Sequence, residues 1–134
     1  GIASALRHLK PDVTVYAAEV ETSAALHAAL AAGEPTMIEY VPSFVDGIGS
    51  GRVLDEMWPL VKELVSGSIV STLDEVEAAV RILAVRNHVV AEGAGAASVS
   101  GALKAGAGEG KVVCIVSGGN INATKLADIL SRGG

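Results

Sequence analysis

Apolar residues recur along the 134-residue chain with two kinds of spacing, and the two kinds alternate. Apolar positions three or four residues apart are typical of a helix with one buried face, whereas short continuous apolar runs are typical of buried strands. The helical spacing predicts helices from Ile2 as far as Pro11, and over Ala24–Ala32, Trp58–Val65, Thr72–Leu83 and Leu126–Leu130. A further helix is predicted to follow the small residues Gly93–Ala97 and to end at about Lys104. The apolar runs predict strands at Val13–Ala18, Met37–Val41, Ser68–Ser71, Val89–Ala91 and Lys111–Val116.

The segment Lys111–Val116 gives the clearest strand signal, because apolar residues follow its lysine without interruption. Such continuity indicates a strand buried on both faces, as in a parallel sheet. Strands that alternate with helices are characteristic of α/β proteins, in which helices cover a parallel sheet. The predicted fold is therefore α/β, with three layers and a mostly parallel sheet flanked by helices.

One predicted helix carries a clear start signal. Thr72 is followed three residues later by Glu75, the spacing of a capping box, in which each side chain accepts a hydrogen bond from the other residue's backbone N–H. The apolar face of this helix is predicted to consist of Val76, Val80 and Leu83. Glu77 and Arg81 are spaced for an ion pair along the same helix.

Composition limits the class of protein. Half of the residues are hydrophobic but only 3% are aromatic, and alanine supplies 22 residues and glycine 16. The length suits one domain over residues 1–134, and the aliphatic content argues against disorder. A net charge of −5 gives no surface for nucleic acid, and no apolar run is long enough for a membrane helix. The single cysteine, Cys114, fits a reducing compartment, and we expect a cytoplasmic protein.

Two glycine-containing loops are the candidates for ligand binding. Glu92–Ala97 and Ser117–Asn120 each follow a predicted strand, and ligands of open parallel sheets bind beyond the carboxyl ends of strands. Glycine lets a ligand approach the backbone closely, but the same composition also suits a tight turn with no ligand. The first loop comes close to the dinucleotide-binding pattern, yet no acidic residue follows the next strand, which disfavours a nicotinamide cofactor.

Four segments together carry a resemblance to a known family: Val15–Glu19, Asp46–Ile48, Glu92–Ala97 and Val116–Asn120. In this order and spacing they resemble the C-terminal half of the catalytic domain of the threonine/serine dehydratases and serine racemases. These are pyridoxal-phosphate enzymes of the tryptophan-synthase-β type. The resemblance runs through the whole chain, and it implies part of the large domain of a fold-type II enzyme with pyridoxal 5'-phosphate as the cofactor.

The resemblance also implies roles for individual positions. Ser117 would offer its hydroxyl to the pyridine nitrogen of the cofactor, and Gly118 belongs to the same cofactor-binding loop. Glu92 would lie beside the ring, and Asn120 matches a position that contacts nucleotide in effector-binding racemases. A neutral hydroxyl cannot keep the ring nitrogen protonated as a carboxylate would. The ring is then a weaker electron sink, which favours prompt elimination of a β-hydroxyl group.

A metal site is not predicted. Glu19 matches a divalent-cation ligand of the racemases, but the second carboxylate of that site falls on Ala25. His8, His27 and His88 lie far apart in the sequence, without the spacing of a zinc site.

Important parts of the family's active site do not match this sequence. The lysine that forms the Schiff base, the asparagine under the ring and the glycine-rich phosphate loop all precede the matching region, and that loop would end just before Gly1. The helical pattern also begins at Ile2 with no capping residue. We therefore expect residues 1–134 to be the C-terminal portion of a catalytic domain, to be inactive alone, and to dimerise through exposed apolar surface.

Several functions remain open from the sequence. The leading one is part of an ammonia-lyase that converts a hydroxy amino acid, L-threonine or L-serine, into a 2-oxo acid and ammonia. One alternative keeps the cofactor and fold but makes the parent protein a serine or aspartate racemase, or another β-eliminating enzyme. The other is a non-catalytic α/β module that binds a ligand or partner through its two glycine loops.

Overall fold

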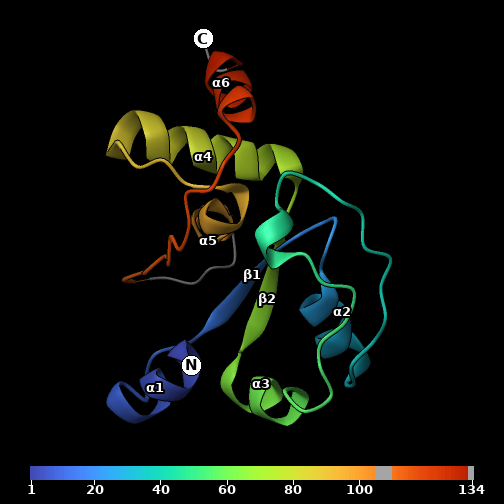
Figure 1. The fold of residues 1–134 in the computed structure, drawn as a ribbon. Coiled ribbons are helices and arrows are strands. Elements are labelled where there is room, and N and C mark those ends of the chain that lie inside the picture. Colours follow the sequence, from blue (N-terminus) through green and yellow to red (C-terminus); the bar gives the residue numbers. More distant parts are fainter. Residues whose placement is uncertain (105–109, 133–134) are drawn as a thin grey trace.

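Two parallel strands lie at the centre of the fold, and helices cover both of their faces (Figure 1). The computed structural model describes residues 1–104 and 110–132. In these residues β1 (Tyr16–Val20) pairs with β2 (Gly67–Ser71), with Tyr16 opposite Gly67 and Val20 opposite Ser71. Helix α2 (Ala25–Ala32) packs on one face of the pair and α5 (Gly93–Leu103) on the other. The predicted α/β class, with helices on both sides of a parallel sheet, is confirmed.

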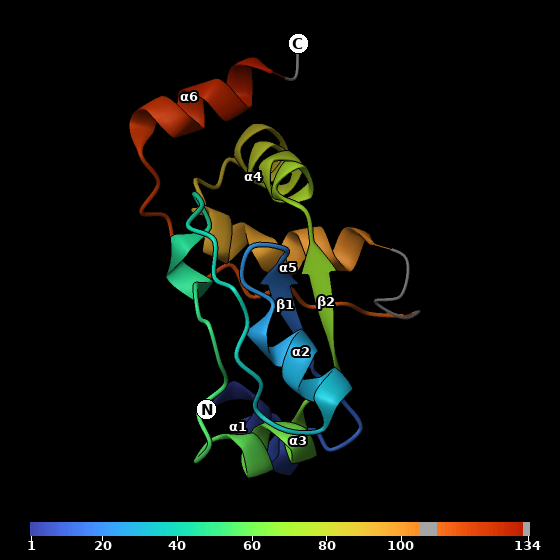
Figure 2. The same ribbon diagram turned by 90° about the vertical axis from the view of Figure 1, so that its right-hand side faces the viewer.

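The remaining elements extend this arrangement at both ends. They are α1 (Ile2–Leu9), the 3-10 helix η1 (Asp46–Ile48), α3 (Trp58–Leu64), α4 (Leu73–Asn87) and α6 (Ala123–Ser131). Helices α1 and α3 contact each other beyond the amino ends of the strands (Figure 2). At the opposite end α4 packs on α5, and α6 packs on α4 (Figure 2). None of the described helices is long and apolar enough to cross a membrane.

Local signals in the sequence set the helix boundaries. The capping box of Thr72 and Glu75 is present in full at the start of α4. Gly33 ends α2 in the left-handed conformation with φ of 78°, which glycine adopts without steric cost. Pro59 lies in the first turn of α3, where its missing N–H breaks no helical hydrogen bond. The side chain of Asn122 caps α6 by accepting hydrogen bonds from two backbone N–H groups.

The core lies where α4, α5 and α6 meet the carboxyl end of β1. Its largest fully buried side chains include Val20, Val45 and Ile129. The predicted apolar face of α4 is confirmed, because Val76, Val80 and Leu83 are all buried. Small residues dominate the buried face of α5, which lets this helix lie close to the sheet and to α4.

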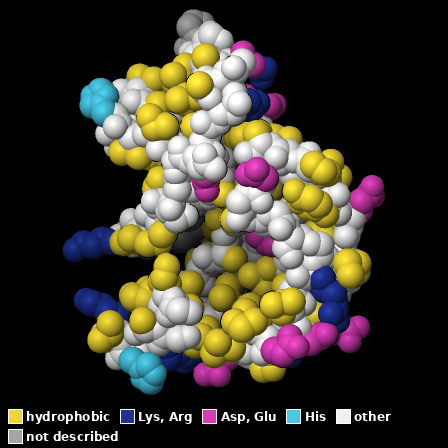
Figure 3. All heavy atoms as spheres, viewed as in Figure 1, with side chains coloured by type: hydrophobic (Ala, Val, Ile, Leu, Met, Phe, Trp, Pro, Cys, Tyr) yellow, Lys and Arg dark blue, Asp and Glu magenta, His cyan; other side chains and the backbone are white. Residues whose placement is uncertain are grey.

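Three predicted strands are wrong. Met37–Val41, Val89–Ala91 and Lys111–Val116 have no strand structure. Val113 in the last of these segments is 83% exposed, although the apolar run predicted burial on both faces. A strand needs a neighbour to share its hydrogen bonds, and no described strand lies beside these segments. Figure 3 shows hydrophobic side chains gathered around a hollow on one face of the molecule.

Two further predictions are corrected by the structure. The first predicted strand begins three residues later than expected, at Tyr16, and continues to Val20. Glu77 does not pair with Arg81; its carboxylate instead contacts Lys125 Nζ at 2.5 Å and the Arg132 guanidinium at 3.3 Å. Glu77 faces α6 from a buried position, where an uncompensated charge would be costly, so the pairs to α6 replace the pair along the helix.

Candidate functional site

Three segments that are far apart in the sequence meet at the N-terminus of α5. They are η1, the start of α5 after Glu92, and the loop Ser117–Asn120. The backbone N–H of Glu92 donates to the Gly118 carbonyl oxygen at 3.0 Å. The backbone N–H of Asn120 donates to Glu92 Oε2, also at 3.0 Å. The predicted loop Glu92–Ala97 is wrong, because Glu92 caps α5 and Gly93–Ala97 belong to that helix. The start of α5 is joined to the Ser117–Asn120 loop through both the backbone and the side chain of Glu92.

The carboxylate of Glu92 occupies a space that two glycines leave open. A methyl group on Gly118 would lie 2.5 Å from Glu92 Oε1, and one on Gly47 would lie 3.2 Å from the same oxygen. Glu92 is the N-cap residue of α5, but its side chain makes no capping hydrogen bond. The carboxylate is directed instead toward the Ser117–Asn120 loop, where it accepts the Asn120 N–H.

The Ser117–Asn120 loop lies directly on the first turn of α5. A methyl group on Gly95 would come within 2.8 Å of the Gly118 carbonyl oxygen, and one on Gly119 within 2.8 Å of the Val90 carbonyl oxygen. Contacts this short leave no room for side chains between the two backbones. The glycines of both loops thus have a packing role in the chain itself.

The outer surface of this junction suits a flat ligand with a ring nitrogen. Ser117 and Asn120 are exposed, and among the described residues no side-chain hydrogen bond involves the Ser117 hydroxyl. A free hydroxyl can donate a hydrogen bond to the lone pair of a ring nitrogen. The four cofactor-binding candidates of the sequence are therefore adjacent: Ser117, Gly118, Glu92 and Asn120.

A hollow beside this junction is lined by Phe44, Asp46, Asn120, Ile121, Asn122 and Lys125. Lys125 Nζ lies 4.5 Å from the centre of the Phe44 ring, and it also pairs with Glu77 on α4. The lysine charge is therefore already engaged by a carboxylate and an aromatic face.

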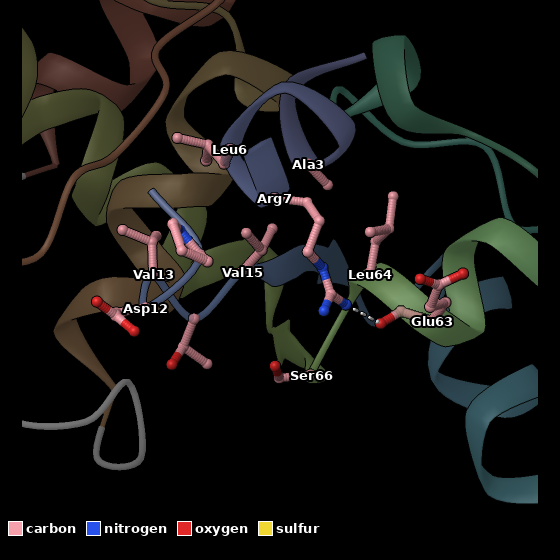
Figure 4. Close-up of a pocket in the computed structure, with 11 residues that line it drawn as sticks. Ala3, Leu6, Arg7, Asp12, Val13, Val15, Glu63, Leu64 and Ser66 are labelled. Carbon is pink, nitrogen blue, oxygen red and sulfur yellow. Dashed lines mark hydrogen bonds between the residues drawn. The ribbon is translucent and has the colours of Figure 1, made fainter. Parts of the chain in front are cut away.

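A second hollow lies at the other end of the molecule, between α1, α3 and the segment before β1 (Figure 4). Arg7 crosses it and donates from Nη2 to the Glu63 carbonyl oxygen at 3.0 Å (Figure 4). This hollow is at the amino ends of the parallel strands, whereas ligands of such sheets bind at the carboxyl ends. It is separate from the junction around Glu92.

Glu19 acts as a cap for α2 in this structure. Its Oε1 accepts the Leu26 N–H at 2.8 Å, and its Oε2 accepts the His27 N–H at 2.7 Å and the Ser68 hydroxyl at 2.5 Å. A carboxylate at a helix N-terminus is favoured by the helix dipole. The described residues contain no group of three His, Cys, Asp or Glu side chains able to hold a metal ion. The three histidines are exposed and belong to different helices or helix ends.

Sequence reasoning assigned no role to two hydroxyl residues that hold the η1 segment in place. Ser23 contacts Ser50, and Thr22 contacts Ser43. Both partners lie more than twenty positions away along the chain, and no local pattern signals such contacts.

Comparisons with known proteins identify a family for the chain. Residues 1–118 match the family described as pyridoxal-phosphate dependent enzymes. The L-threonine ammonia-lyase of Thermotoga maritima is 33% identical over 134 residues, which cover 99% of this chain and 33% of that protein. The biosynthetic L-threonine dehydratase of Mycobacterium leprae is 36% identical over 98% of this chain and 32% of its own length.

Solved structures also match nearly the whole of this chain with only part of their own length. The structure of maize serine racemase superposes with a TM-score of 0.85 at 25% identity, over 98% of this chain and 43% of that one. The chain thus spans about a third of the length of the curated relatives it matches. Because the match to the family extends over most of the sequence, the chain belongs to the pyridoxal-phosphate dependent enzymes.

Proposed function

We propose that residues 1–134 are the C-terminal portion of the catalytic domain of a pyridoxal-phosphate dependent L-threonine or L-serine dehydratase. The observation that carries this proposal is the junction around Glu92, where the carboxylate binds the Asn120 N–H and lies against Gly118. The relatives that are 33% and 36% identical are named for L-threonine deamination, which favours this activity over racemisation.

Each residue of the junction has a distinct part in the proposed site. Ser117 would donate its hydroxyl to the pyridine nitrogen of the cofactor, and Gly118 leaves the space in which the Glu92 carboxylate lies. Glu92 fixes the loop by accepting the Asn120 N–H. When bound, pyridoxal phosphate supplies an electron sink, so that a substrate can lose its α-proton and then its β-hydroxyl group. The neutral Ser117 hydroxyl would leave that sink weak, which suits prompt departure of the β-hydroxyl group.

Two lysines, Lys104 at the C-terminal end of α5 and Lys125 in α6, support the proposal that this chain is inactive alone. Lys104 Nζ donates to the Val70 carbonyl oxygen at 2.9 Å and pairs with Glu75 at 2.8 Å. Lys125 pairs with buried Glu77. A lysine that carries the cofactor needs a free amine, and the amines of Lys104 and Lys125 are both paired with carboxylates. We therefore place the cofactor-bearing lysine in the part of the enzyme that this chain does not span.

The exposed segment Val112–Val116 supports the same proposal. Its residues have the apolar, β-branched composition of a buried strand, but Val113 is 83% exposed. In the proposed whole domain this segment joins the parallel sheet, covered by the portion that relatives possess in addition. For the chain alone we propose self-association, with a dimer as the simplest form.

The proposal can be tested by exchanging segments. This chain replaces the matching segment of the Thermotoga maritima L-threonine ammonia-lyase, and the exchanged enzyme is tested for cofactor absorbance and for release of ammonia from L-threonine. We expect cofactor binding and turnover in the exchanged enzyme and neither in the isolated chain. If the isolated chain turned over L-threonine, and borohydride fixed the cofactor to one of its lysines, the proposal that the cofactor-bearing lysine lies outside this chain would be wrong.

The role of Ser117 has its own control in the same enzyme. Ser117→Ala should weaken cofactor binding and lower the rate of elimination, because the ring nitrogen loses its hydrogen-bond donor. Ser131→Ala serves as the matched variant, since its hydroxyl only donates to the Asp128 carbonyl oxygen at the end of α6. If the two variants had equal cofactor affinity and equal elimination rates, Ser117 would not be a cofactor-binding residue.

A further inference from the structure

The connection between α2 and α3 is tied at two points to the turn that follows β1. The turn contains Thr22 and Ser23, and the connection contains η1. Each hydroxyl residue holds one side of η1 through hydrogen bonds.

Ser23 holds the segment after η1. Its side chain is buried, with 2% of the residue exposed. The hydroxyl oxygen accepts the Ser50 N–H at 2.7 Å, and the hydroxyl donates to the Ser50 carbonyl oxygen at 2.9 Å. One hydroxyl thus satisfies both backbone groups of a single residue, which fixes the orientation of Ser50 as well as its distance.

Thr22 holds the segment before η1. Its hydroxyl and the Ser43 hydroxyl lie 3.1 Å apart, and its carbonyl oxygen accepts the Val41 N–H at 3.0 Å. The Ser43 hydroxyl in turn accepts the Val45 N–H at 3.2 Å. These bonds lead directly to Val45, the buried residue immediately before η1.

The segment between the two ties lies against the junction around Glu92. Gly47 is in η1, and a methyl group there would be 2.9 Å from Ala94 Cβ and 3.2 Å from Glu92 Oε1. Gly47 therefore limits where the Glu92 carboxylate can lie, and Glu92 in turn holds the Asn120 N–H. The position of the Ser117–Asn120 loop depends on η1, and the position of η1 depends on Thr22 and Ser23.

We propose that Thr22 and Ser23 are positioning residues for the cofactor site, acting through η1 on Glu92. This inference rests on the proposed function, because it assigns the Ser117–Asn120 loop to the cofactor. Neither hydroxyl contacts the loop itself. Their effect is to keep Gly47 in place, so that the carboxylate of Glu92 has one position, in which it accepts the Asn120 N–H.

The first test uses the 134-residue chain without any cofactor. Amide hydrogen exchange is measured at Ser50 and Asn120 for Ser23→Ala and Thr22→Val. We expect exchange at Ser50 in Ser23→Ala, and at Asn120 in both variants, to become about three- to tenfold faster, the range for losing a net hydrogen bond. Thr22→Ser keeps a hydroxyl and should restore the original rate.

Matched variants separate this effect from general destabilisation. Ser66→Ala removes an exposed hydroxyl beyond the amino end of β2, and Thr36→Val removes a hydroxyl that donates only to Glu34, in the same connection. Both should leave exchange at Asn120 unchanged. Faster exchange at Ser50 with no change at Asn120 would overturn the proposal, because the ties would then fasten the connection alone.

The second test measures cofactor dissociation in the segment-exchanged enzyme. Ser23→Ala should release pyridoxal phosphate about three- to tenfold faster, and Ser66→Ala should match the unmodified protein. Unchanged release in Ser23→Ala, from an enzyme that binds the cofactor, would also overturn the positioning role. Absence of cofactor binding in the unmodified exchanged enzyme would count against the proposed function. The amide exchange at Asn120 would still decide whether Thr22 and Ser23 act on the Ser117–Asn120 loop.

Discussion

Two glycines of the junction differ in what an added methyl group would meet. At Gly95 it would lie 2.8 Å from the Gly118 carbonyl oxygen, which belongs to the backbone and cannot move alone. At Gly118 it would meet the carboxylate of Glu92, the end of a side chain that can rotate away. We expect Gly95→Ala to lower the free energy of unfolding by about 1–3 kcal/mol, the usual cost of overpacking. Gly118→Ala should cost less, but it should release the Asn120 amide.

Urea denaturation and amide exchange together check this difference. Gly101→Ala is the control, because a methyl group there meets only ordinary contacts at 3.6 Å. Gly101 lies within α5, where alanine is favoured over glycine, so this variant should be as stable as the original chain or more stable by about 0.5–1 kcal/mol. If Gly95→Ala were as stable as Gly101→Ala, the Gly118 carbonyl oxygen would have to lie farther from Gly95 than the structure places it.

The sequence indicated the residues of the junction but not how they touch. Glu92 and the Ser117–Asn120 loop were found because each follows an apolar run and precedes a predicted helix. The hydrogen bond from the Asn120 N–H to Glu92 joins residues 28 positions apart, and that of Ser23 to Ser50 joins residues 27 apart. Serine is common in turns for local reasons, so its type alone cannot reveal a distant backbone partner.

The start of α4 gives the fold a dependence on pH. The hydrogen bond from Lys104 and the one from the Thr72 N–H hold the pKa of the Glu75 carboxyl below its usual value. A lowered pKa in the folded state contributes stability above the ordinary glutamate pKa of about 4.3, and this contribution is lost as the pH falls below that value. In Glu75→Gln the loss of stability between about pH 7 and pH 3 should therefore be smaller than in the original chain.

Thermal unfolding at several pH values measures this effect. Asp74→Asn is the matched variant, because it removes a carboxylate from the same helical turn without touching the bonds of Glu75. Its melting temperature should decline toward acid in nearly the same way as that of the original chain. If the melting temperature of Glu75→Gln fell toward acid as steeply as that of Asp74→Asn, Glu75 would not be a source of the pH dependence.

Helices and strands differed in how well the sequence predicted them. The helical spacings found all six α-helices of the described residues, since a helix makes its hydrogen bonds within its own segment. Strands need partners, and Lys111–Val116 pairs with no strand among residues 1–104 and 110–132. The ion pair predicted between Glu77 and Arg81 failed for a related reason, because α6 supplies closer partners that no local pattern in α4 can show.

Exposed apolar surface should govern how the isolated molecule associates. Val113 is the most exposed residue of the segment Val112–Val116, and an exposed extended segment offers both apolar contacts and unpaired backbone groups. We expect the chain to form dimers or larger species in sedimentation experiments. Val113→Lys should shift it toward monomer, because a charge would be buried in the contact.

Val85→Lys provides the comparison for this experiment. Val85 is 61% exposed on α4, and the same charge is added there away from the extended segment. Association unaffected by Val113→Lys but reduced by Val85→Lys would move the contact surface to α4. A monomer at high concentration in the original chain would show that the exposed segment does not drive association at all.

The tie between Ser23 and Ser50 also bears on the order in which the chain folds. Ser68 in β2 meets Glu19 in β1 across 49 positions, so pairing the strands closes a long loop. Ser23 and Ser50 are 27 positions apart within it, and their contact roughly halves the length that remains to be closed. Because the entropy of closure grows with the logarithm of loop length, pairing the strands costs about 0.6 kcal/mol less once the Ser23–Ser50 contact has formed at its own closure cost. A hydroxyl that steadies a loop in the folded protein thereby also divides the closure of the sheet into two shorter steps.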